Sequence, residues 1–388
     1  MSVRVAVVGL GWAGRTIWLP RLAAHPAFEV TALVEPDPTP EHGTYGVPIL
    51  GDADDLTPDL ADLAVVAVPN HAHAPVAGKL LHKGIPVYLE KPVCLTTGEA
   101  DRLAEAERAG GAVLLAGSAA RHRADIQAVR RLLDSLGEIR HVNLSWVRAR
   151  GVPGGLGWFT RRSLAGGGVL VDLGWHLLDT LSLLLGPVTF EQVGATVSAD
   201  HVTGRTWRAG WRGDEPEAGT PGRDTAPGCD VEDTARAFLV TATGISVSLH
   251  TCWASHAPVD VTTVEVHGSA GTAVLRCTFG FSPNRVQAPT LTLTRDGHSS
   301  AVPLPDEPLG TEYDRQVDAL PGELADPAAR GRSVRAARRT VGLIERIYDA
   351  ARGAVPAAGG AVTAPVPGGA GTITVEDAPW REPTWTAG

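Results

Sequence analysis

The most constraining feature of this chain is a glycine-rich turn that directly follows its first apolar run. Residues 3–8 read Val-Arg-Val-Ala-Val-Val, a short and mostly apolar run typical of a strand buried on both faces of a parallel sheet. The turn Gly9-Leu10-Gly11-Trp12-Ala13-Gly14 comes next, and a helical pattern of apolar residues follows over 17–22. Glycines allow the backbone to turn tightly and to approach a pyrophosphate, which the amino terminus of the helix then binds. This order of strand, turn and helix predicts a dinucleotide-binding domain.

An acidic residue at the end of the second predicted strand indicates which dinucleotide is bound. This strand covers residues 29–34 and ends at Glu35, about twenty residues beyond the glycines, where the fingerprint places a carboxylate. A carboxylate there accepts hydrogen bonds from the adenosine ribose and repels a 2′-phosphate. No arginine follows Pro36 and Asp37 to bind such a phosphate. We therefore expect NAD rather than NADP, and Asp37 takes the role of Glu35 if the strand ends two residues later.

The loop after the third predicted strand is a second part of the expected cofactor pocket. This strand covers residues 63–68 and is followed by Pro69-Asn70-His71-Ala72-His73. We expect Pro69, Asn70 and His73 to line the pocket, or Asn70 and His73 to cap a helix that begins near Ala74. The two histidines have no cysteine or carboxylate cluster beside them, so we expect structural histidines rather than a metal site.

Lys91 is one of only three lysines in the chain, and it stands between Glu90 and Pro92. It follows the apolar run 85–89, so its ammonium is expected at the carboxyl edge of the sheet, where open α/β folds bind ligands. A partly buried lysine can exchange a proton, whereas arginine stays protonated. Pro92 restricts the backbone and permits a cis bond, which would hold the lysine in one orientation. The alternative is a strand-end salt bridge between Lys91 and Glu90.

A second decisive passage lies at residues 166–179 and reads Gly-Gly-Gly-Val-Leu-Val-Asp-Leu-Gly-Trp-His-Leu-Leu-Asp. Its dense glycines predict a backbone that lies close to a flat ligand such as a nicotinamide ring. Asp172 and His176 are four residues apart, so they would share one face of a helix that starts near Leu173. A carboxylate and an imidazole can shuttle a proton near neutral pH. The alternative makes Asp172 a helix cap and His176 a buried core histidine.

These passages, in this order and at these separations, resemble the Gfo/Idh/MocA family of oxidoreductases over roughly residues 3–350. The resemblance implies an α/β protein: an amino-terminal Rossmann domain with a doubly wound parallel sheet, then an α+β domain with a large open, mostly antiparallel sheet. It also implies that Lys91, Asp172 and His176 are the catalytic residues, and that the open sheet mediates a homodimer or homotetramer. The expected domains are residues 1–120 and 121–355, followed by an Ala/Gly/Pro-rich tail over 356–388.

Composition excludes several classes of partner. The chain has 388 residues, a formal net charge of −9 and 44% hydrophobic residues, as expected for a cytoplasmic protein of two domains that binds neither nucleic acid nor membrane. The most apolar stretch, 169–185, contains Asp172, His176 and Asp179, which would be costly in lipid.

A Gly/Pro/Arg-rich insertion over 201–230 is a lid, an oligomer arm or a mobile surface loop.

The expected reaction is NAD-dependent oxidation or reduction of a secondary alcohol on a sugar or cyclitol. His176 would accept the hydroxyl proton, with Asp172 orienting it, while Lys91 holds the oxygen; whether Lys91 or His176 is the formal base stays open. No metal is needed, because a lysine can stabilise the developing alkoxide. Further substrate-binding residues are predicted among the aromatic and basic side chains: Trp158, Trp175 and Arg121.

The substrate is narrowed by a resemblance of residues 9–20 to dehydrogenases of aminoglycoside pathways. The best hypothesis is oxidation of an aminoglycoside sugar hydroxyl, such as 3″, to the ketone before transamination, and the net negative charge suits a cationic substrate. The alternatives are an NAD-dependent glycosidase that uses transient oxidation, a catabolic inositol or sugar dehydrogenase, and a silent dinucleotide-binding regulator.

Overall fold

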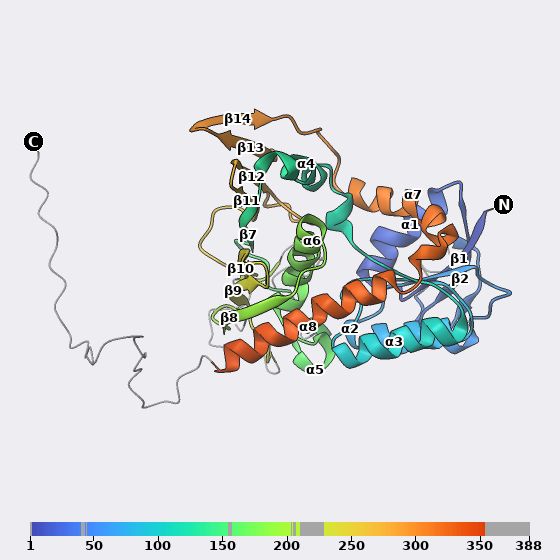
Figure 1. Cartoon of the computed structure of the whole chain (residues 1–388). Helices are drawn as coiled ribbons and strands as arrows, with labels where there is room; N and C mark the ends of the chain where they lie inside the picture. Colours follow the sequence, from blue (N-terminus) through green and yellow to red (C-terminus); the bar gives the residue numbers. More distant parts are fainter. Residues whose placement is uncertain are drawn as a thin grey trace, which may run out of the picture.

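The computed structural model describes residues 2–39, 43, 45–153, 157–202, 204, 207–209 and 229–353. These residues form two β-sheets with helices packed on them (Figure 1). The first has six parallel strands in the order β3-β2-β1-β4-β5-β6, and the second has eight strands in the order β14-β13-β12-β11-β7-β10-β9-β8. Within the second sheet only β7 and β10 pair in parallel. The predicted doubly wound sheet and the mostly antiparallel open sheet are therefore both confirmed.

The amino-terminal domain follows the predicted alternation of buried strands and covering helices. The apolar runs become strands because alternate side chains enter the cores on the two faces of the sheet: Ala6 and Val8 on one, Val5 and Val7 on the other. Its elements are β1 (Val3–Val8), a helical segment of η1 (Gly14–Trp18) and α1 (Leu19–Ala24), β2 (Phe28–Val34), β3 (Ile49–Leu50), η3 (Ala53–Asp55), β4 (Leu63–Val66), α2 (Asn70–His82), β5 (Val87–Leu89), α3 (Thr97–Gly110) and β6 (Leu114–Ala116).

The strand order places a crevice at the carboxyl ends of β1 and β4. The chain runs from β1 to β2 on one side and to β4 on the other, so β1 and β4 are neighbours although their connections lead in opposite directions. Such a switch point is where ligands bind in open α/β sheets. The glycine turn follows β1 and the segment 69–73 follows β4, so both predicted cofactor segments lie at this crevice. The helix after β4 begins at Asn70, four residues earlier than expected.

The second domain packs helices on one face of its open sheet. Its strands alternate in burial, as β7 shows, because one face meets the core and the other does not. The elements are η4 (Ala119–His122), α4 (Ala124–Leu132), η5 (Leu133–Leu136), β7 (Ile139–Val147), η6 (Trp158–Thr160), α5 (Arg162–Ala165), η7 (Leu170–Gly174), α6 (Trp175–Leu185), β8 (Phe190–Ser198), β9 (Thr234–Thr241), β10 (Ser246–Cys252), β11 (Val261–Gly268), β12 (Gly271–Cys277), β13 (Thr290–Arg295) and β14 (His298–Val302).

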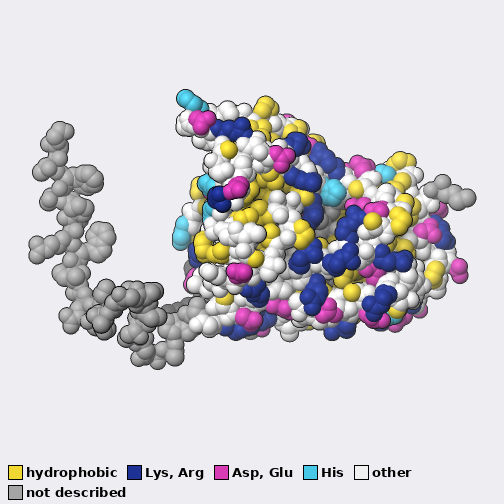
Figure 2. Space-filling view, viewed as in Figure 1, with side chains coloured by type: hydrophobic (Ala, Val, Ile, Leu, Met, Phe, Trp, Pro, Cys, Tyr) yellow, Lys and Arg dark blue, Asp and Glu magenta, His cyan; other side chains and the backbone are white. Residues whose placement is uncertain are grey.

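Three later segments tie the two domains together. Helix α7 (Thr311–Ala325) and η9 (Pro327–Ala329) return to the first domain, where Val317, Leu320 and Ala329 complete one of its cores. Helix α8 (Arg332–Gly353) then runs along both domains and packs against α3 and β8 (Figure 1). Basic and acidic side chains are interspersed along the α3 and α8 edge in Figure 2. One ion pair joins the two helices, between Arg338 of α8 and Asp101 of α3 at 2.6 Å.

Among the described residues, one helical run, Arg162–Leu185, is long and apolar enough to cross a membrane, and 67% of its most apolar window is buried inside the protein. This run is therefore a core segment of the second domain. All four cysteines are free thiols. Most of the insertion expected over 201–230 and the whole tail over 356–388 lie outside the described residues, so the expected roles of the insertion stay predictions.

Candidate active site

A cavity of about 630 Å³ lies between the carboxyl edge of the first sheet and the second domain. Its floor comes from the ends of β1, β2, β4 and β5, and its opposite wall comes from the end of β7 and from η6, η7 and α6. The predicted site residues on its lining are Gly9, Gly11, Trp12, Ala13, Glu35, Pro69, Asn70, His73, Glu90 and Lys91 at the cofactor end, and Trp158, Asp172 and His176 at the far end.

The glycine turn has the backbone that a dinucleotide site requires. Gly9 has a φ of 89°, and a Cβ there would lie 2.7 Å from the carbonyl oxygen of Ala67. Gly11 lines the cavity, and no atom lies within 4 Å of the place its Cβ would take. Gly14 is not on the cavity wall; a Cβ there would collide with the carbonyl oxygen of Gly9, so this glycine allows the helix to pack on the turn.

Glu35 lies at the end of β2, beside this turn. One carboxylate oxygen accepts a hydrogen bond of 2.7 Å from the backbone N–H of Leu10, and the other lies 3.4 Å from the backbone nitrogen of Asp37. The side chain therefore holds the glycine turn and also faces the cavity, which Asp37 lines as well. Both carboxylates considered from the sequence thus lie on the lining of the cavity.

His73 and Asn70 connect the cofactor end to neighbouring segments. The ring nitrogens of His73 lie 2.6 Å from the carbonyl oxygen of Pro92 and 2.8 Å from that of Val68, and burial lowers the pKa of this imidazole to about 4. Asn70 donates a hydrogen bond of 3.0 Å to the carbonyl oxygen of Ala165. Among the described residues no group of three or more histidine, cysteine or acidic side chains is arranged to hold a metal ion.

Lys91 reaches across the cavity to the second domain. Its Nζ lies 2.9 Å from Oδ1 of Asp172, and its backbone N–H donates a bond of 2.9 Å to Oε2 of Glu90. The expected alternative, an ion pair between Lys91 and Glu90, is therefore replaced by a pair with Asp172. The Lys91–Pro92 peptide bond is cis.

Asp172 and His176 both line this wall of the cavity from one helical run, which starts earlier than predicted. Asp172 sits in the π-helical turn η7 rather than before a helix that starts near Leu173, and it bonds to Lys91. Burial alone would raise the pKa of Asp172, but the charges of Lys91 and Arg148 outweigh burial and hold this pKa well below its usual range. Burial, and then the charge of Lys91, lower the pKa of His176 to about 3, so its imidazole is neutral at ordinary pH.

Three features predicted for the substrate end do not line the main cavity. The glycines at 166–168 meet protein rather than an open ligand site: their Cβ positions would collide with Leu95, Tyr348 and Glu232, respectively. Trp175 lines a separate hollow of about 380 Å³ between α5, α6 and α8. Arg121 pairs with Asp179 at 2.6 Å and does not line the main cavity. The glycines therefore serve close packing, Trp175 lies in another part of the second domain, and Arg121 forms an internal ion pair.

The structure adds site residues that the sequence reasoning missed. Trp146 and Arg148 come from the end of β7, and the Arg148 guanidinium lies 5.0 Å from the Trp146 ring. The Trp146 ring is 5.6 Å from that of His176. Trp253, directly after β10, donates a hydrogen bond of 3.0 Å to Oδ2 of Asp172. Their place in the sequence could have indicated them, because these side chains, like Lys91, lie at or just after the end of a strand.

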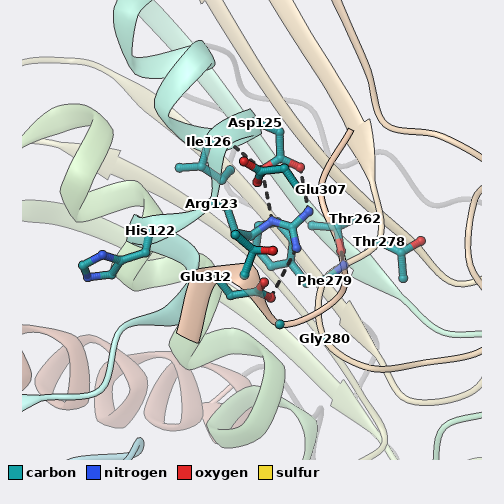
Figure 3. Close-up of polar contacts among 12 residues, drawn as sticks. His122, Arg123, Asp125, Ile126, Thr262, Thr278, Phe279, Gly280, Glu307 and Glu312 are labelled. Atoms are coloured by element: carbon teal, nitrogen blue, oxygen red, sulfur yellow. Dashed lines mark hydrogen bonds and ion pairs between the residues drawn. The ribbon is translucent and has the colours of Figure 1, made fainter. Parts of the chain in front are cut away.

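A buried charge cluster fixes another part of the cavity wall (Figure 3). Arg123 lies between Asp125, at 2.6 Å, and Glu312, at 3.6 Å, and its guanidinium lies 4.6 Å from the Phe279 ring. The cluster therefore joins the start of α4, helix α7 and the loop after β12. That loop carries Phe281, whose ring stacks at 5.5 Å on Tyr313 of α7, and both rings line the cavity.

Comparison with known proteins identifies the family. Residues 3–118 match the oxidoreductase family with an NAD-binding Rossmann fold, and residues 126–274 match the GFO/IDH/MocA C-terminal domain. The chain is 57% identical over 365 residues to a putative UDP-kanosamine synthase oxidoreductase subunit from Amycolatopsis mediterranei strain S699, covering 92% of this chain and 99% of that protein.

Two solved structures share the fold at low identity. GenD2 from gentamicin A biosynthesis, in complex with NAD, matches with a TM-score of 0.69 and 23% identity, covering 90% of this chain and 94% of that one. KijD10, a 3-ketoreductase from Actinomadura kijaniata in complex with NADP and TDP-benzene, matches with a TM-score of 0.69 and 22% identity, covering 90% and 98%. Together with the matches along the sequence, these results show that the chain belongs to the Gfo/Idh/MocA family of oxidoreductases.

Proposed function

We propose that this protein is an NAD-dependent dehydrogenase that oxidises a secondary alcohol of a sugar. The observation that carries the proposal is the ion pair between Lys91 and Asp172, placed beside His176 in the cavity that also holds the glycine turn and Glu35. The residues present suit NAD: Gly9 permits the tight turn, Gly11 leaves room for a pyrophosphate, and Glu35 supplies a carboxylate for the ribose. When bound, NAD would accept the hydride from the carbinol carbon.

The proton of the alcohol needs a separate acceptor. His176 is neutral at ordinary pH because burial and the charge of Lys91 lower its pKa to about 3, so a ring nitrogen is unprotonated. The negative charge that develops on the substrate oxygen would raise the basicity of this imidazole as it takes the hydroxyl proton. The Lys91 ammonium would hold the hydroxyl oxygen and stabilise the negative charge that develops there. Asp172 would keep this ammonium in place. The geometry thus favours His176 as the base and Lys91 as the electrostatic group, whereas the sequence left this choice open.

We further propose that the sugar is linked to a nucleotide. Most of the length of this chain is similar to a protein whose name includes UDP-kanosamine, an amino sugar, and forming an amine at a sugar carbon first requires a ketone. Among the described residues of the cavity wall that the second domain supplies, the charged side chains are Arg148 and Asp172, and the charge of Asp172 is balanced by Lys91 across the cavity. This local charge suits an anionic nucleotide sugar better than the polycationic aminoglycoside expected from the sequence.

The proposal is tested by incubating the protein with NAD and a panel of sugars while NADH formation is followed. The panel contains UDP-glucose, free glucose, myo-inositol and an aminoglycoside. We expect NADH to accumulate with UDP-glucose in proportion to the ketone formed. Release of free sugar without net NADH would indicate the NAD-dependent glycosidase instead. NAD binding without turnover of any compound would indicate a silent regulator.

We also propose that the open face of the second sheet forms a homodimer or homotetramer. Phe238 on β9 is 52% exposed, a large fraction for a phenylalanine. We expect light scattering to give a mass of at least two chains, and Phe238→Glu to lower it. A monomeric mass for the unmodified protein would contradict the proposal.

A further inference from the structure

Trp253 is a fully buried residue that does not line the main cavity but bonds to a side chain that does. It follows the last residue of β10, and its backbone N–H donates a bond of 2.8 Å to the carbonyl oxygen of Asp233, which fixes its place on the sheet. Its indole N–H donates a bond of 3.0 Å to Oδ2 of Asp172. The other oxygen of that carboxylate, Oδ1, accepts the bond of 2.9 Å from Lys91. Each oxygen of Asp172 therefore has a donor from a different element.

This arrangement fixes the orientation of the carboxylate. Rotation of the Asp172 carboxylate about its last torsion would break the bond to the indole, the bond to Lys91, or both. Asp172 is itself in the turn η7, while Trp253 belongs to the second sheet and Lys91 to the first domain. Through Asp172, the indole therefore couples the position of the Lys91 ammonium to the second sheet.

A similar pair acts on the backbone of the same lysine. Trp18, which is also fully buried, donates an indole bond of 2.9 Å to Oε1 of Glu90, and Oε2 of Glu90 accepts the bond from the backbone N–H of Lys91. Lys91 is therefore held at its backbone and at its ammonium by carboxylates that each also accept an indole N–H. The repetition of this arrangement indicates a positioning role rather than incidental packing.

We infer that Trp253 is a positioning residue for the proposed reaction: its indole N–H holds Asp172 so that Lys91 points at the substrate oxygen. The inference rests on the proposed function for its effect on turnover, but not for its effect on Lys91. Without the N–H, one buried oxygen of Asp172 loses its partner, and the carboxylate is free to turn away from the lysine.

The test compares Trp253→Phe with Trp175→Phe. Both variants keep an aromatic ring and remove an indole N–H from a buried tryptophan, but Trp175 lines the separate hollow. For Trp253→Phe we expect kcat to fall roughly 10–100-fold while KM for the sugar and Kd for NAD change less than about twofold, because a bond to a charged group is lost without loss of a binding contact. Trp175→Phe should stay within about threefold of the unmodified protein.

A second readout does not depend on turnover. The chain has only three lysines, so labelling with an amine-specific reagent and mass spectrometry reports each one separately. We expect Lys91 to label roughly threefold faster or more in Trp253→Phe, because its ion pair is loosened, while Lys79 and Lys83 keep their rates as internal references. Thermal melting checks that each variant is folded.

The outcomes separate the inference from the proposed function. If no sugar yields NADH but Lys91 labels faster in Trp253→Phe, the proposed function fails and the positioning role stands. Unchanged labelling of Lys91, or a loss of kcat equal to that of Trp175→Phe, overturns the inference. Trp253→His keeps a ring N–H in a smaller side chain. It should therefore recover part of the kcat and part of the slow labelling of Lys91. A histidine variant no better than the phenylalanine variant would also overturn the inference.

Discussion

Glu35 combines two tasks in one carboxylate. It accepts a bond from Leu10 in the glycine turn, and it faces the part of the cavity where an adenosine ribose would lie. We predict that NAD binds at least about tenfold more tightly than NADP, a difference of about 1.4 kcal/mol, because the carboxylate repels a 2′-phosphate.

Fluorescence titration of both cofactors measures this preference. Glu35→Gln should bring the two dissociation constants together, whereas Asp37→Asn, on the same rim, should leave the ratio unchanged. Equal affinities for NAD and NADP in the unmodified protein would remove Glu35 from its assigned role.

The element that places Asp172 is the turn η7, and its start depends on Glu232. This carboxylate is buried, and it accepts bonds of 3.0 Å and 3.1 Å from the backbone N–H groups of Gly168 and Leu170 and one of 2.8 Å from the hydroxyl of Tyr348. The glycines at 166–168 allow this close approach, because a side chain there would collide with its neighbours. Glu232 therefore caps the segment that carries Asp172.

We predict that Glu232→Ala lowers the free energy of unfolding by about 3 kcal/mol, because three buried donors lose their acceptor. Activity of the folded fraction should fall as well, because Asp172 lies two residues after Leu170. Urea unfolding measures the first effect. The control is Glu191→Ala on β8, where the side chain is exposed and little change is expected. Equal stability of the two variants would contradict the capping role.

At the scale of the whole molecule, the buried histidines make stability depend on pH. Burial lowers the pKa of His73 to about 4 and that of His176 to about 3, so both stay neutral in the folded protein while the unfolded chain binds protons below pH ~6.5. Asp172 acts in the same direction at lower pH. Its depressed pKa stabilises the folded protein above the pKa of the unfolded carboxylate, about 3.9, and this stabilisation is lost as the pH falls below that value.

We therefore predict that the melting temperature falls as the pH is lowered from about 7 to about 4.5. Each buried histidine contributes at most about 1.4 kcal/mol per pH unit in this range. His73→Asn should reduce the dependence on pH, although it also removes the contacts to Pro92 and Val68. A melting temperature that is constant or rises on acidification would contradict the sign of this effect.

The sequence predicted the two sheets and the NAD-binding Rossmann domain because these depend on local patterns. Runs of apolar residues identify buried strands, and a glycine turn or a lysine after such a run is carried to the same sheet edge. The sequence did not predict contacts whose two partners come from distant segments of the chain. Arg121 pairs with Asp179, Trp175 packs beside α8, and Asp172 bonds to Lys91 and Trp253. No spacing within one segment reports such contacts.

The central claim is that Lys91 is the group that holds the reacting oxygen, and the kcat of Lys91 variants tests it most directly. We predict that Lys91→Ala lowers kcat by roughly 10²–10⁴-fold with little change in NAD affinity. Lys91→Arg should recover little, because a planar guanidinium is broader than an ammonium and would not place its charge at the same point between Asp172 and the substrate oxygen. Lys79→Ala, whose lysine pairs with Asp54 at the surface, should behave like the unmodified protein. Near-normal kcat in Lys91→Ala would contradict the account and place the reaction elsewhere.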